Sequence, residues 1–141
     1  MSHTAPLIAA PATSNRRLAR RIGAVLAGLM VNVVLGTATD AVLHATGVYP
    51  PAPRRMAGAL FLLALAYRTI YGIAGSYLTA RLAPDRPMQH ALTLGGIGVA
   101  LGTAGTLAMW GAGPAWYALA VIAVTMPCAW LGARLRIGAR R

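Results

Sequence analysis

One apolar stretch of the chain, residues 22–45, contains a group of polar side chains that could do chemistry. Asp40 is one of only two acidic residues in the protein, and Asn32, Thr37 and His44 lie near it in the sequence. Asn32, Asp40 and His44 are separated by multiples of four residues, which places them along one slanting ridge of a helix. Carboxylate, amide, hydroxyl and imidazole groups inside a membrane segment are typical of a relay for protons or ions.

A basic residue, Arg68, lies near the middle of a second apolar stretch. A charge at the bilayer centre costs ~2.5–3.5 kcal/mol on insertion scales, so Arg68 should face other helices and find a partner. Asp40 is the partner available within an apolar stretch, because the other acidic residue, Asp85, falls in a loop. The sequence therefore predicts a buried polar pair of Asp40 and Arg68. Two alternatives stay open: an ion or proton relay, and a protonated Asp40 that faces water or lipid.

Catalytic and metal-binding chemistry finds little support in the sequence. His44 falls near one end of its stretch and His90 at the opposite membrane face, and a span is about 30 Å thick, so the two cannot share one metal. The sequence contains no HExxH, GxSxG or P-loop motif. We therefore predict no metal, no cofactor and no enzymatic activity.

The composition indicates that these side chains sit in a membrane protein. Of the 141 residues, 57% are hydrophobic and 11% charged, whereas a soluble domain carries about 25% charged residues. A bilayer-spanning helix needs roughly 20 mostly apolar residues, and four stretches qualify. We predict an all-α integral membrane protein, a four-transmembrane-helix bundle, with spans at about 22–45, 57–80, 91–110 and 115–133.

The arginines predict how the chain is threaded. All 13 basic residues are arginine, and the net charge is +11. Ten of them would lie on one side of the membrane and only Arg54 and Arg55 on the other, which places both termini in the cytoplasm. We predict a flexible cytoplasmic tail over residues 1–15 and a single transmembrane domain over 16–141. Arginines that flank apolar stretches favour anionic lipid headgroups as partners rather than nucleic acid, and the absence of lysine suggests the inner membrane of a GC-rich bacterium.

Small residues predict how the helices pack, because lipid gives little hydrophobic drive between helices and close approach matters more. Gly28 and Gly36 lie on the polar ridge of the first span, and Gly98 and Gly102 form a GxxxG pair in the third. These glycines are expected to pack inside the bundle, with a dimer face as the alternative. A weak similarity between residues 35–47 and 101–113 would fit two tandem helical hairpins, although chance similarity of composition also explains it.

The function expected from these features is that of a non-catalytic accessory, assembly or scaffolding subunit in a homo-oligomer or larger membrane complex. The alternative is a small oligomeric transporter coupled to protons or ions. In size and in its four spans the chain resembles small multidrug-type exporters, which place an acidic residue in their first span. No residue role is carried over from that resemblance.

Overall fold

A computed structural model of the chain describes residues 12–51 and 54–139, with side-chain surroundings from residue 15 onward. In that part of the chain there are four helices: α1 Ala12–Ala45, α2 Gly58–Leu82, α3 Pro87–Ala108 and α4 Ala115–Gly138. Each is long and apolar enough to cross a membrane, as predicted. Of the predicted tail, residues 1–11 lie outside the described residues, and residues 12–15 already belong to α1.

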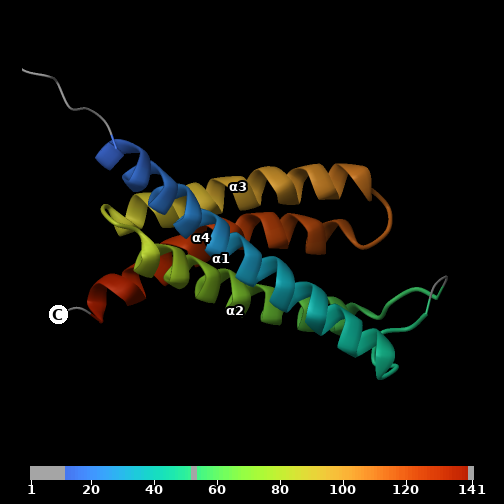
Figure 1. Cartoon of the computed structure of the whole chain (residues 1–141). Helices are drawn as coiled ribbons and strands as arrows, with labels where there is room; N and C mark the ends of the chain where they lie inside the picture. The colour runs from blue at the N-terminus through green and yellow to red at the C-terminus, as the bar shows by residue number, and fades with distance from the viewer. Residues whose placement is uncertain (1–11, 52–53, 140–141) are drawn as a thin grey trace, which may run out of the picture.

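Helix α2 is the centre of the packing. It contacts all three other helices, most extensively α4 and α1, while α3 packs mainly on α4. The backbones of α1 and α4 do not come close to each other along their described lengths. Figure 1 shows that the start of α1, the loop 83–86 and the end of α4 lie at one end of the molecule. We call it the arginine end. Residues 46–51 and 54–57 of the first connection and residues 109–114 of the third lie at the opposite end, which we call the loop end.

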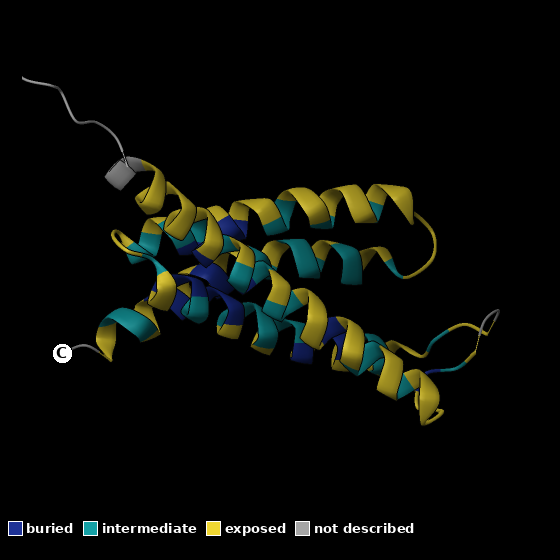
Figure 2. Cartoon of the chain, viewed as in Figure 1, coloured by how far each residue is buried: buried dark blue, intermediate teal, exposed yellow. Residues whose placement is uncertain are grey.

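The half toward the arginine end is the most tightly packed, and small residues make this possible. A Cβ atom added to Gly28 would stand 2.5 Å from the carbonyl oxygen of Gly75 on α2 and would also collide with Thr79. A Cβ added to Gly132 of α4 would stand 2.5 Å from the carbonyl oxygen of Ile73 on α2. Figure 2 shows the buried residues gathered mostly in this half. The helices therefore approach each other backbone to backbone here.

The other glycines predicted to pack, Gly36, Gly98 and Gly102, differ in what surrounds them. A Cβ on Gly98 would stand 2.9 Å from Thr125 Cγ2, and one on Gly102 would stand 3.5 Å from Ile122 Cγ1, both on α4. These two glycines thus face α4 of the same chain. Gly36 is buried, yet a Cβ there would meet nothing within 4 Å.

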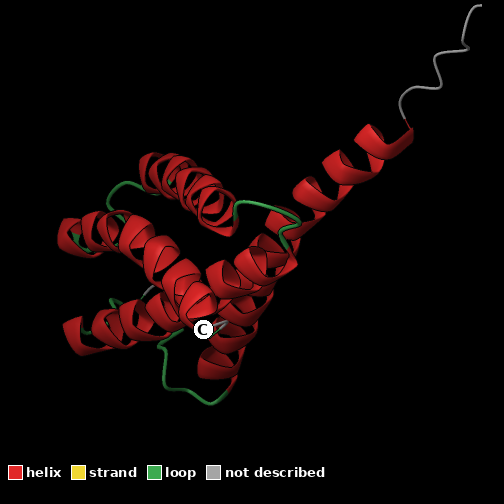
Figure 3. Ribbon diagram, turned by 90° about the vertical axis from the view of Figure 1, so that its left-hand side faces the viewer, coloured by secondary structure: helices red, strands yellow, loops and turns green. Residues whose placement is uncertain are grey.

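Toward the loop end the helices spread apart. Figures 1 and 3 show the α1–α2 pair and the α3–α4 pair diverging from the arginine end. Bulky side chains gather in this half: Tyr49 and Tyr67 form a buried cluster with Ala64, and Tyr71 and Tyr117 pack against it. Because large side chains hold helix axes further apart than glycine or alanine does, the larger of the two cavities described below lies in this half.

The outer surfaces of the helices are strongly apolar. Large hydrophobic side chains are exposed along every helix, as expected of surfaces that face lipid rather than water. On α1 alone they are Leu18, Ile22, Leu26, Met30, Val33, Val34, Leu35 and Val42.

Candidate functional site

Polar side chains of α1 and α2 meet in the half of the molecule toward the loop end. Arg68 Nη2 donates a hydrogen bond to Asp40 Oδ2 over 2.5 Å. The hydroxyl of Tyr67, the residue before Arg68, donates to the other carboxylate oxygen, Oδ1. Both oxygens of Asp40 are thus held by donors from α2, and the two opposite charges are adjacent.

Further tyrosines extend this polar contact along the seam between α1 and α2. The hydroxyl of Tyr49, from the loop 46–57, lies 3.3 Å from the Tyr67 hydroxyl. Tyr71 lies one turn further along α2, and its hydroxyl is 2.9 Å from Thr39 Oγ1 on α1. None of these tyrosines is among the site residues predicted from the sequence. The four-residue spacing of Tyr67 and Tyr71, beside Arg68, was the signal that could have found them.

The other polar residues of the predicted ridge are not brought together into a relay. His44 Nδ1 is 2.9 Å from the backbone oxygen of Asp40, and its ring meets Tyr49 edge-on. Thr37 is exposed on α1. Asn32 lies toward the arginine end, where it lines a small cavity. Among the described residues, no hydrogen bond links Asn32, Thr37 or the His44 ring to the Asp40 carboxylate.

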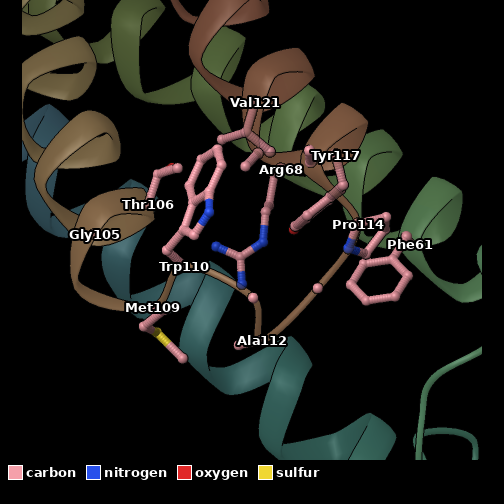
Figure 4. A pocket seen from close by; sticks show the side chains of 14 residues that line it. Phe61, Arg68, Gly105, Thr106, Met109, Trp110, Ala112, Pro114, Tyr117 and Val121 are labelled. Carbon is pink, nitrogen blue, oxygen red and sulfur yellow. The ribbon is translucent and has the colours of Figure 1, made fainter.

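Arg68 borders two separate cavities. The larger, of about 520 Å³, lies between α2, the end of α3 and the start of α4. Figure 4 shows the Arg68 guanidinium reaching into it between Trp110 and Tyr117. The smaller, of about 160 Å³, lies among all four helices, with Asn32 and Cys128 on its wall. Asp40 borders neither cavity, so Arg68 separates the carboxylate from the larger one.

A second ion pair lies at the arginine end, in a position that the sequence did not reveal. Arg21 of α1 donates to both carboxylate oxygens of Asp85 in the loop 83–86, through Nη2 to Oδ2 and through Nε to Oδ1 at 3.2 Å. The hydrogen bond from Arg21 lowers the pKa of the Asp85 carboxyl below its ordinary value of 3.8. Both side chains are exposed, so this pair lies at the surface.

No group of three or more His, Cys, Asp or Glu side chains that could hold a metal gathers within residues 12–51 and 54–139. The cysteine, Cys128, is buried, with Sγ 3.6 Å from the backbone oxygen of Thr69. Comparison of the chain with family models, with curated proteins and with solved structures finds no match.

Proposed function

We propose that the protein is a four-transmembrane-helix bundle that acts without catalysis, as an accessory, assembly or scaffolding subunit of a membrane complex or homo-oligomer. The observation that carries the proposal is that each oxygen of the Asp40 carboxylate accepts a hydrogen bond from α2, one from Arg68 and the other from Tyr67. Each oxygen keeps a second lone pair, but a proton or cation that approached it would also meet the adjacent positive charge of Arg68. The role that fits such a group is to fix how α1 and α2 meet.

The proposed location is the inner membrane of a bacterium, with both termini in the cytoplasm. Eight described arginines lie at the arginine end, and Arg54 and Arg55 lie at the loop end. This asymmetry supports a cytoplasmic arginine end by the positive-inside rule. Its proposed partners are anionic lipid headgroups, which attract basic residues at that face. The expectation of no nucleic-acid partner follows from the same placement, because the arginines border apolar helices.

One observation favours the alternative of a small proton- or ion-coupled transporter. Arg68 borders a cavity toward each half of the molecule, and its side chain remains 40% exposed. A group placed between two cavities could alternate between them, as intramembrane charges on substrate pathways do. The two functions make opposite predictions for the removal of the Asp40 charge.

A double-mutant cycle on Asp40 and Arg68 tests the proposal. If the pair is structural, Asp40→Asn and Arg68→Gln each leave one charge without a partner and lower the yield of folded protein in detergent. Breaking a buried pair costs roughly 3–5 kcal/mol in soluble proteins. The double variant should recover much of the loss, and Arg55→Gln, a loop control, should fold like the wild type.

The transporter predicts a different pattern from the same variants. Asp40→Asn should then fold as well as the wild type, since a neutral side chain is easier to bury, and should lose pH-dependent uptake in liposomes. Additive losses without coupling would refute the structural role of the pair.

A further inference from the structure

The larger cavity has the size and the wall of a ligand site. Its volume of about 520 Å³ falls within the range of roughly 300–1,000 Å³ typical of small-molecule pockets. Phe61, Trp110, Tyr117 and Val121 give it an apolar and aromatic wall, and Gly111 and Gly113 of the connection 109–114 also line it. Such pockets usually have a mostly apolar wall that carries only a few polar groups.

Among the residues that the structure describes, Arg68 is the only charged side chain on the wall of this cavity. A guanidinium has five N–H donors in a fixed fork, and within the described residues Asp40 takes a single one of them, on Nη2. The side chain is 40% exposed, and Figure 4 shows its guanidinium within the cavity. Because Asp40 does not border the cavity, a group that enters meets the arginine and not the carboxylate.

We propose that this cavity binds the anionic headgroup of an amphiphile, a carboxylate or phosphate joined to an acyl chain. Guanidinium matches both groups with paired, charge-assisted hydrogen bonds. The wall supplies aromatic contact for the first part of the chain, and the remainder can continue onto the apolar surface that α3 and α4 expose, which includes Leu107 and Leu119. Helix α4 also begins on this wall, so its positive end adds to the attraction for an anion.

The inference concerns a ligand and not the subunit role proposed above, so either can fail without the other. The same headgroup chemistry occurs in a free fatty acid and in an anionic phospholipid, and the experiment separates these two sources. The alternative to both is that water molecules alone fill the cavity and accept the hydrogen bonds of Arg68, without any amphiphile.

Quenching of tryptophan fluorescence by a brominated probe tests the site, because Trp110 lines the cavity. The full chain in a neutral detergent is titrated with dibrominated stearate, and in parallel with the methyl ester of that acid. We expect saturable quenching by the acid and only weak, non-saturable quenching by the ester, which lacks the charge. Equal quenching by both probes, or none by either acid or anionic phospholipid, would overturn the proposal.

Two matched variants of α3 show whether the probe occupies this cavity. Gly105 lines it and Gly96 does not, yet a Cβ at either position meets nothing within 4 Å. Both Gly105→Leu and Gly96→Leu should therefore fold, but the first places a side chain in the cavity. We expect Gly105→Leu to weaken stearate binding about tenfold or more, and Gly96→Leu to leave it unchanged. Equal binding by the two variants would place the probe elsewhere and refute the site.

Two further experiments test whether Arg68 binds the headgroup and identify whether the headgroup belongs to a fatty acid or to a phospholipid. The double variant Asp40→Asn with Arg68→Gln, which is expected to fold, should lose saturable stearate binding; retained binding would refute the role of Arg68. Dibrominated phosphatidylglycerol, compared with dibrominated phosphatidylcholine, then reports on phospholipid. Saturable quenching by the phosphatidylglycerol but not by the phosphatidylcholine assigns the site to anionic phospholipid, and saturable quenching by neither lipid assigns it to free fatty acid.

Discussion

At the scale of residues, the contact between Asp40 and Arg68 was the easiest part of the site to expect. Two opposite charges on consecutive apolar segments have strong reason to meet, since each is costly to leave alone in a membrane. Tyr67 could not be placed in the same way. A tyrosine next to Arg68 can turn toward lipid, toward α4 or toward α1, and only the rotation of α2 against α1 decides which. The hydrogen bond from Tyr67 to Asp40 depends on that rotation.

The Arg21–Asp85 pair was missed for a related reason. It joins α1 to a loop 64 residues away along the chain, and at the membrane surface water offers every charge an alternative partner. Sequence alone therefore gives such a pair no advantage over other arginines nearby. Its geometry follows from the tilt of α1 against the loop 83–86.

The Asp85 carboxyl should make stability depend on pH in one acidic range. Its pKa in the folded protein lies below the ordinary value of 3.8 because of the hydrogen bond from Arg21. The stabilisation is therefore fully present above pH 3.8 and is lost as the pH falls through the lower, folded-state pKa. Thermal unfolding in detergent should show Asp85→Asn slightly less stable than wild type at neutral pH, and the two should converge in acid. A difference that persists unchanged below that range would mean that the pair contributes nothing.

At the scale of helices, hydropathy was sufficient to find all four elements, because each is a long apolar run with turn-forming residues at its ends. It was harder to predict which face of each helix packs against a neighbouring helix. Gly28 was singled out from its place on the ridge of α1, and it does face α2. Gly75 and Gly132, which meet other backbones just as closely, were not singled out. In a chain rich in glycine, spacing alone does not show which glycines face a neighbouring helix.

Close packing at the arginine end should make Gly28 intolerant of a side chain. Gly28→Leu pushes against Thr79 and the backbone at Gly75, and overpacking of this kind typically costs about 1–3 kcal/mol, occasionally more. Gly23→Leu, on the same helix with open space around its Cβ, is the matched control. We expect a lower apparent unfolding temperature for Gly28→Leu alone. Similar temperatures for both variants would show that α1 and α2 are not held this closely.

At the scale of the whole molecule, the larger cavity was beyond the reach of the sequence. It exists because the α3–α4 pair diverges from α2 toward the loop end, and that divergence follows from side-chain volumes in two halves of the bundle. Residues 61, 68, 105 and 121 come from three helices, so no local pattern connects them. The weak similarity of the two hairpins also gave no indication that their ends would separate.

The threading of the chain can be tested with reporter fusions. Fusions after Arg141 and within residues 85–88 should report the cytoplasm, because arginines gather at that end. Fusions within residues 50–53 and 111–113 should report the opposite side. A fusion after Arg141 that reports the far side would rule out the proposed orientation.

The ion pair between α1 and α2 also bears on how the chain enters the membrane during synthesis. Asp40 is made before its partner, so α1 alone carries a carboxylate that its own segment cannot neutralise. Insertion scales assign about 2.5–3.5 kcal/mol to such a residue at the helix centre, which is an upper bound for Asp40 because it lies nearer one end of the 22–45 span. Arg68 follows 28 residues later. The first two helices are then expected to leave the translocon as one hairpin rather than in turn. Chains truncated after Leu82 should integrate stably, and chains truncated after Ala57 should integrate poorly unless Asp40 is replaced by Asn. Equal integration of both truncations would show that α1 enters the bilayer unaided.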